Sequence, residues 1–304
     1  MSGGGGKLSS LVSRGVVVAN REMRCDVQQA ESATLPKRVS HSQMALFNQC
    51  GLKYFFSYIA GFKEPNTAAL TGGSITHEVV ENLYKEPAEA RTLERAIELL
   101  REHGKRILEK PEYQPFAEDN VMKQSVREAV ENLFKIENPQ ELEVQPEHLE
   151  MNLDVMINGV HFFGQVDRFT DNDKKRVADY KTGKSPGKFV EGKLAQPFLY
   201  ALAFKEQHGI DVDEVELIYL NARERVTREV KPENLVDVGD KLAAMRADSE
   251  SSLAASAWTA TQTKLCDWCA FQPVCPAFET DAPTPGSRES DAKLLDIGRV
   301  FRKY

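Results

Sequence analysis

The sequence predicts an α/β fold in which a helical first half precedes a strand-rich second half. Two observations carry this prediction. The hydrophobic pattern changes from a helical to a two-residue period near residue 141, and Asn158-Gly159 separates two alternating segments, as a hairpin turn does. With 304 residues, of which 41% are hydrophobic and 28% charged, the chain has the length and composition of a globular protein with a substantial core.

The N-terminal part is expected to begin with a tail and continue as helices. Residues 1–38 contain a run of glycines but no long periodic pattern, which predicts a flexible tail with one short strand at 15–19. A helix is expected from Ser40, because Ser40 and Gln43 fit a capping box, and its apolar face continues to about residue 60. Further helices complete a helical part, residues 39–140, and are predicted at 73–84, 88–109 and 119–136.

The strands are expected to form the core of the protein, residues 141–250. Four segments have strand patterns: 149–157, 160–169, 176–182 and 214–220. Helices are predicted at 194–207 and 232–247. A cysteine-containing C-terminal part, residues 251–304, is expected to end in a short helix from Ala292 to Arg302.

Two carboxylates and a lysine are expected to converge on these strands. Residues two apart in a strand share a face, so Asp179 and Lys181 point the same way, and Asp167 ends the neighbouring strand. Carboxylates bind Mg²⁺ or Mn²⁺, and such a metal with a nearby lysine activates water for phosphodiester hydrolysis. Taken alone, Asp-x-Lys is more often a surface ion pair. Asp154 is a competing carboxylate, but Asp167 is preferred because it lies next to the third strand.

The order of the motifs resembles the RecB-type signature of the PD-(D/E)XK nuclease superfamily. The matching segments are Gly73-x-x-x-His77, Gly164-Gln-Val-Asp167, Asp179-Tyr-Lys181-Thr-Gly183 and Gln196-x-x-x-Tyr200. The resemblance implies a restriction-endonuclease-like α/β core with a central mixed sheet. It also implies roles for the motif residues: metal ligation by His77, Asp167, Asp179 and the Tyr180 carbonyl, and catalysis or DNA contact by Lys181, Gln196 and Tyr200.

One departure concerns Pro197, which lies inside the Gln196–Tyr200 segment. Proline is tolerated in the first turn of a helix but not deeper. Either the helix starts near 193–196, or the geometry of the glutamine and the tyrosine differs from that of the family.

Four of the five cysteines form a pattern of one plus three: Cys50, then Cys266-x-x-Cys269 and Cys275 near the C-terminus. An odd number of cysteines without a signal peptide favours metal or redox chemistry over disulfides. The pattern resembles that of Cas4 and AddB-type nucleases, which implies a 4Fe-4S cluster joining the N-terminal helices to the C-terminal part. A zinc site uses the same ligands and stays open as an alternative. Cys25 is expected to be a free thiol.

These features predict a Mg²⁺- or Mn²⁺-dependent DNA exonuclease that acts on single strands or DNA ends and is Cas4-like. No Walker A pattern is present, so unwinding would come from a helicase partner, and an integrase is the other expected partner class. Two alternatives stay open: a non-catalytic DNA-end-binding or assembly subunit of a recombination or CRISPR adaptation complex, and a zinc-stapled interaction protein with a fortuitous Asp-x-Lys.

The charge and the termini bound these hypotheses further. The net charge of −7 argues against a protein coated in nucleic acid, while the basic residues around 174–193 are as typical of a solvated surface as of a DNA groove. Without an apolar signal-peptide core or a stretch of about 18 apolar residues, the chain is expected in the cytoplasm and not in a membrane.

Overall fold

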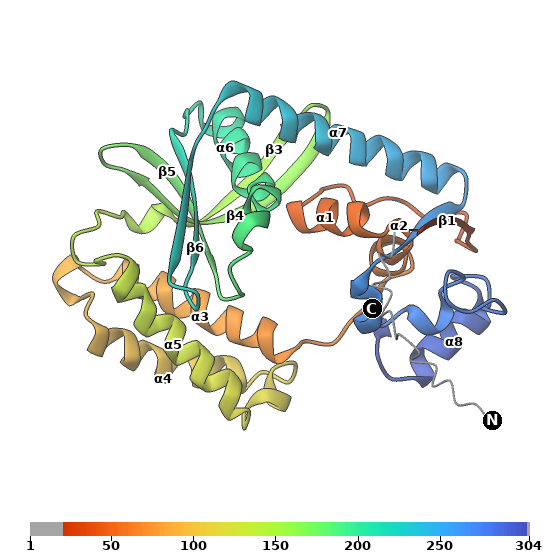
Figure 1. Cartoon of the computed structure of the whole chain (residues 1–304), viewed down its shortest axis with the longest axis horizontal. Coiled ribbons are helices and arrows are strands. Elements are labelled where there is room, and N and C mark those ends of the chain that lie inside the picture. Colours follow the sequence, from red (N-terminus) through yellow and green to blue (C-terminus); the bar gives the residue numbers. More distant parts are fainter. Residues whose placement is uncertain (1–20, 303–304) are drawn as a thin grey trace, which may run out of the picture.

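The core of the protein is a five-stranded mixed sheet, seen in a computed structural model that describes residues 21–302 (Figure 1). Its strands follow the order β3-β4-β5-β6-β7, and all neighbours are antiparallel except β5 and β6. Helix α6 (Ala195–His208) is the crossover that parallel pairing requires. The strands are Leu149–Ile157, Val160–Asp171, Lys175–Lys181, Glu214–Tyr219 and Glu224–Glu229. The predicted mixed sheet is confirmed, although β7 was not predicted.

The turn between β3 and β4 fixes the register of the sheet's first hairpin. Asn158 and Gly159 both have positive φ angles, 46° and 79°, as a type I′ turn requires. The resulting pairs include Leu149 with Arg168 and Met151 with Val166. The hairpin predicted from Asn-Gly is therefore confirmed.

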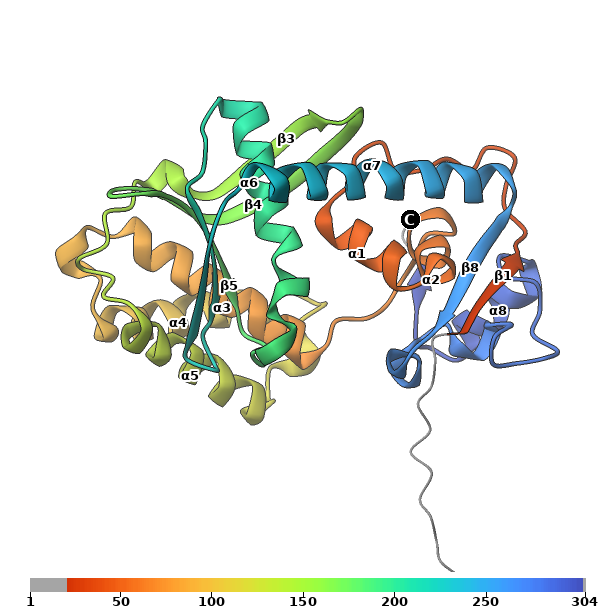
Figure 2. The same cartoon turned by 45° about the horizontal axis from the view of Figure 1, so that its top comes forward.

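Helices cover both faces of the sheet. Helices α3 (Ala68–Lys85), α4 (Leu93–Leu108) and α5 (Asn120–Ile136) form a layer on one face, where Ala178, Tyr180 and Ile218 join their core. Helices α6 and α7 (Pro232–Ala254) pack with the alternate residues of the strands, on the opposite face (Figures 1 and 2). The alternation of a strand thus gives each face its own hydrophobic core.

A second group of elements lies along and below the C-terminal half of α7 (Figure 2). Strand β1 (Arg21–Asp26) pairs antiparallel with β8 (Ala257–Gln262), and β2 (Phe62–Lys63) pairs with β9 (Phe301–Arg302). The helices of this group are α1 (His41–Gln49), α2 (Gly51–Tyr54), a π-helical turn (Phe55–Ile59) and α8 (Arg288–Asp296). Trp258 of β8 is fully buried against the rings of Phe47, Tyr54 and Phe55.

This group corrects two predictions. The tail predicted for residues 1–38 is too long, because residues 21–26 pair with a strand more than 200 positions away, which no local pattern indicates. The strand predicted at 15–19 lies outside the described residues. The single helix predicted from Ser40 has its capping box but is broken at Cys50, whose backbone is extended and whose Sγ accepts the Lys53 N–H.

The other helices agree with the predicted positions to within a few residues, except that α3 begins five residues earlier, α4 begins five residues later and α7 extends to Ala254. The last helix was predicted from Ala292 and begins at Arg288. Within residues 21–302, every helix is too short or too polar to cross a membrane.

Candidate metal centre and active site

Three carboxylates form a row across the sheet. The paired positions on either side of Asp167 place it opposite Glu150 of β3 and opposite Asp179 of β5. Neither pair belongs to the regular ladder, so the strands open at this row. Glu150 has a φ of 48°, an unfavourable backbone conformation for a residue with a side chain. Such local strain, next to clustered charges, is typical of a functional site.

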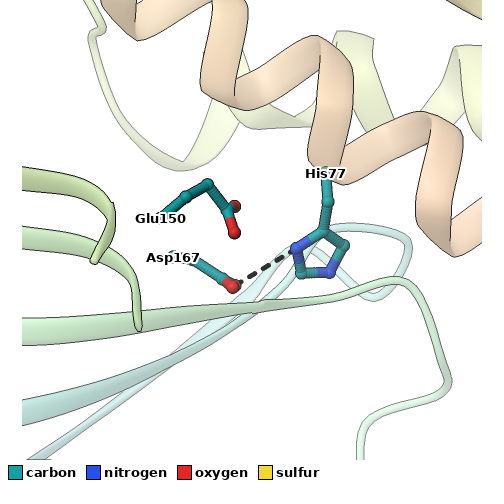
Figure 3. A group of neighbouring side chains, drawn as sticks. All are labelled: His77, Glu150 and Asp167. Carbon is teal, nitrogen blue, oxygen red and sulfur yellow. Dashed lines mark ion pairs between the residues drawn. The ribbon is translucent and has the colours of Figure 1, made fainter. Parts of the chain in front are cut away.

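Helix α3 adds a histidine to one end of this row. Ligand atoms of His77, Glu150 and Asp167 all lie within 4.8 Å of one another (Figure 3). His77 Nδ1 is 3.3 Å from Asp167 Oδ2, and the backbone N–H of Tyr180 donates to the same oxygen at 2.7 Å. An imidazole nitrogen and hard carboxylate oxygens can therefore reach one ion.

Lys181 and Asp179 lie at the other end of the row. Lys181 Nζ is 2.6 Å from Asp179 Oδ2 and donates to Gln196 Oε1 at 2.9 Å. Gln196 in turn donates to the Tyr200 hydroxyl at 2.9 Å. Helix α6 starts at Ala195, so Pro197 lies in the first turn and leaves the one-face geometry of Gln196 and Tyr200 intact.

Gly164 makes room for this chain of contacts. A β-carbon at Gly164 would lie 2.7 Å from Cε1 of Tyr200 and 3.2 Å from the Phe162 ring. The glycine in the Gly-x-x-Asp pattern therefore lets the Tyr200 ring lie against β4, from where its hydroxyl reaches Gln196.

A buried ion pair supports the row from the other face of the sheet. Arg168 contacts both oxygens of Glu137, at 2.7 and 3.2 Å, and both side chains are almost fully buried. The Tyr180 hydroxyl also donates to Glu137, at 3.0 Å. Because Arg168 and Tyr180 directly follow Asp167 and Asp179, this network fixes the strands that carry the two carboxylates.

Side chains of this cluster stay protonated at pH values at which the same groups in water would be deprotonated. Burial and the charge of Asp167 raise the pKa of Glu150 to about 8 and that of Asp179 to about 6. Burial alone would lower the pKa of His77, but Asp167, Asp179 and Glu150 outweigh it and raise that pKa to about 9. Mutual repulsion of the carboxylates is the physical reason that a cation is favoured here.

The donor set fits a hard divalent cation. Carboxylate oxygens with one imidazole suit Mg²⁺ or Mn²⁺. Asp179 Oδ2 is buried, and within the described chain no hydrogen bond of good geometry reaches it despite the nearby lysine. A cation would satisfy this oxygen and would neutralise the repulsion along the row.

The structure brings the residues predicted from the motifs into one continuous set, from His77 to Tyr200. Asp154, the competing carboxylate, lies away from it and pairs with Arg38 and His161 on the surface. The Tyr180 carbonyl has no contact that bears on its predicted role.

Sequence reasoning missed two residues. Glu150 could have been found, since the Asn158-Gly159 turn sets a register that places it opposite Asp167. His41, the first residue of α1, gave no signal. Burial and the charges of Lys181 and Lys193 lower its pKa to about 4, so it is a neutral imidazole near these two lysines.

The four cysteines of the predicted cluster come from the break between α1 and α2 and from the segment after β8. Cys50 Sγ is 3.9 Å from the carbonyl of Thr259, and Cys266 Sγ is 3.8 Å from that of Thr261. Burial raises the pKa of Cys269, and it raises that of Cys275 to about 12. Among residues 21–302, no three sulfurs lie within 4.8 Å of one another, so the thiols share one region without forming a closed site.

The comparison with family models decides the family. A model described as PD-(D/E)XK nuclease superfamily matches residues 38–276, which include the sheet, the carboxylate row and all four cysteines. The chain belongs to the PD-(D/E)XK nuclease superfamily. Membership indicates a metal-dependent nuclease with DNA as its substrate. A search of curated proteins gives no match.

Proposed function

We propose that the chain is a Mg²⁺- or Mn²⁺-dependent deoxyribonuclease of the RecB/Cas4 type, acting as an exonuclease on single strands or DNA ends. The observation that carries the proposal is the row Glu150–Asp167–Asp179 with His77 at one end and Lys181 at the other. Within the superfamily, this set favours hydrolysis over a purely binding role, because a binding subunit needs no lysine beside the carboxylates.

In this proposal each residue has a separate task. His77, Glu150 and Asp167 hold the cation together with Asp179 and the Tyr180 carbonyl. A cation held there would supply polarisation of the phosphoryl oxygen and a lowered pKa of a water molecule. Lys181, held by Asp179 and Gln196, orients that water and stabilises charge that develops on the phosphate. Gln196 and Tyr200 contact the substrate strand next to it.

The four cysteines are proposed to hold a 4Fe-4S cluster that joins the α1–α2 segment to the C-terminal part. Backbone N–H groups of Lys53 and Thr263 already point at the sulfurs of Cys50 and Cys266. The same four thiolates could hold zinc, with bonds of about 2.3 Å, so the cluster is proposed on the cysteine pattern and zinc is the alternative.

If the four cysteines hold the cluster, the purified protein should be brown, should contain iron and sulfide, and should absorb light at about 400 nm. A colourless protein containing zinc would contradict it and would leave the nuclease proposal untouched.

The activity is tested with end-labelled single-stranded DNA and Mn²⁺. We expect the wild type to degrade the linear strand and to leave a circular single strand intact, since an exonuclease needs an end. Asp179→Ala should be inactive, while Asp154→Asn, a carboxylate change on the same sheet, should be as active as the wild type. If wild type and Asp179→Ala degrade DNA alike, the proposed site is wrong. Strands blocked at the 5′ or 3′ end then give the polarity. A helicase or integrase remains the proposed class of partner.

A further inference from the structure

The helical layer contains two adjoining hollows that the metal centre does not use. The larger one, about 600 Å³, lies between α3, α4 and α5, and the smaller one, about 260 Å³, lies between α3, α5 and the loop after β5. Met122 and Val126 of α5 line both. We call the two together the α3–α5 groove.

One end of the α3–α5 groove lies next to segments that carry two residues of the metal centre. Its smaller hollow is lined by Gly73 and Thr76 of α3 and by Thr182 and Gly183. Thr76 directly precedes His77, and Thr182 directly follows Lys181. The smaller hollow therefore lies beside the chain segments that carry His77 and Lys181, although neither of these side chains lines it.

The other end combines an apolar floor with a basic rim. The floor of the larger hollow is formed by Ile75, Leu100, Leu108, Met122 and Val126. Four cations stand around it, against the single carboxylate of Glu109: Arg101, Lys105, Lys123 and Arg127. This local surplus occurs in a chain whose net charge is −7. The groove is thus a place where an anion with apolar parts is favoured.

Two of these cations are available for a ligand. Arg101 and Lys105 are exposed, are one turn apart on α4, and form no salt bridge with any residue in 21–302. Arg127 is paired with Glu131 at 2.9 Å, and Lys123 is 3.9 Å from the exposed Glu118. At the smaller hollow, Val121 is 82% exposed, an apolar side chain open to solvent at the groove.

We propose that the α3–α5 groove binds the single DNA strand that extends away from the metal centre. A single strand presents phosphates and apolar base faces together, and proteins bind it with a basic groove and side chains, most often aromatic, on which the bases stack. In the α3–α5 groove the apolar side chains are aliphatic. Arg101 and Lys105 contact the phosphates, and the bases lie on the apolar floor. An acidic peptide would match the charges, but the position of the groove beside the segments that carry His77 and Lys181 favours the substrate strand. The inference rests on the proposed nuclease function.

The test measures binding of fluorescein-labelled oligothymidylate by fluorescence anisotropy over a series of salt concentrations, with EDTA present so that no strand is cut. The variant is Arg101→Gln/Lys105→Gln. Each lost phosphate contact on a single strand makes the plot of log affinity against log salt shallower by about 0.7. The double variant should therefore bind more weakly, with a slope reduced by about 1.4.

The matched control is Lys293→Gln/Arg299→Gln, which removes the same charge from exposed positions on or next to α8. It should keep the wild-type slope. If Arg101→Gln/Lys105→Gln also keeps the wild-type slope and affinity, or if both double variants lose slope equally, the groove does not bind the strand.

Cleavage of the same DNA in Mn²⁺ separates this inference from the proposed function. If the wild type cleaves the DNA and Arg101→Gln/Lys105→Gln binds it as the wild type does, the groove proposal is overturned and the nuclease proposal stands. A slope that depends on Arg101 and Lys105, without any cleavage, supports the groove and overturns the nuclease activity.

Discussion

Metal binding at His77, Glu150 and Asp167 should release protons and strengthen steeply with pH. In the metal-free protein the pKa of His77 is raised to about 9 and that of Glu150 to about 8. Both groups therefore hold a proton at neutral pH. A metal ligand has to give up its proton, so binding and deprotonation are linked.

The size of the effect follows from the distance of each pKa from neutrality. One pKa unit corresponds to about 1.4 kcal/mol, so the proton on His77 weakens Mn²⁺ binding at neutral pH by at most about a hundredfold and that on Glu150 by about tenfold. These are upper limits, because 33% of the His77 side chain is exposed and solvent screens its interactions.

The same protons link folding to pH. The folded chain binds more protons than the unfolded chain where a pKa is raised, so the contribution of these groups to stability falls as pH rises. For His77 the fall extends from its unfolded value of 6.5 to about 9, and for Glu150 from 4.5 to about 8. The thermal stabilisation by Mn²⁺ should accordingly increase over this range.

Calorimetric titration with Mn²⁺, in buffers of different ionisation enthalpy, counts the protons. At neutral pH we expect about two protons released per ion. Glu150→Gln should release about one fewer, and Asp154→Asn should behave as the wild type. A titration without proton release, together with an affinity that stays constant as pH rises toward 9, would refute this account of the cluster.

Three further predictions concern the scaffold of the site. Arg168→Met should lower the free energy of unfolding in urea by about 3–5 kcal/mol, because it leaves the buried Glu137 without its main partner. An exposed ion pair contributes about 1 kcal/mol or less, so a loss below that value would contradict the buried pairing. Gly104→Ala should raise the free energy of unfolding by about 0.5–1 kcal/mol, because the new β-carbon would meet no atom closer than 3.6 Å. The same methyl group should narrow the α3–α5 groove and weaken oligothymidylate binding. A destabilised variant would show that the helix has no room for the methyl group. Gly164→Ala should displace the Tyr200 ring, because the new β-carbon would lie 2.7 Å from it. The variant should have a lower kcat and an unchanged affinity for Mn²⁺. An unchanged kcat would argue against a role for Tyr200.

The sequence predicted the sheet well where local chemistry sets the structure. The Asn158-Gly159 turn and the alternation on either side of it fix both strands and their register. The boundaries of α5 were also close to those observed, since its apolar periodicity is strong. Those of α6 were close as well, and there Pro197 in the first turn and the left-handed Gly209 at the C-cap mark the two ends.

Long-range pairing was the part that local patterns could not reveal. Strand β1 is paired with β8, far away in the chain, and its residues include four charged side chains, so it has no apolar alternation to recognise. The break at Cys50 depends on a sulfur that accepts a backbone N–H, a contact invisible to helix periodicity.

The candidate site likewise contains residues that local sequence patterns place and residues that only long-range packing places. Asp179 and Lys181 share a strand face by periodicity alone, and the contact of Lys181 with Gln196 follows from the start of α6. Glu150 follows from the hairpin register, but no motif marks it. His41 approaches Lys181 only through the tertiary packing of α1, so no spacing in the sequence could place it there.

Single-turnover cleavage by Lys181→Met tests the central claim most directly, because this substitution leaves the proposed metal ligands in place. With labelled single-stranded DNA and Mn²⁺, we expect the variant to bind both metal and DNA as the wild type does and to cut the strand at least about a hundredfold more slowly, the lower end of what losing one group that stabilises transition-state charge costs. Cleavage at the wild-type rate by Lys181→Met would contradict the claim that this row of carboxylates and its lysine form the active site of a nuclease.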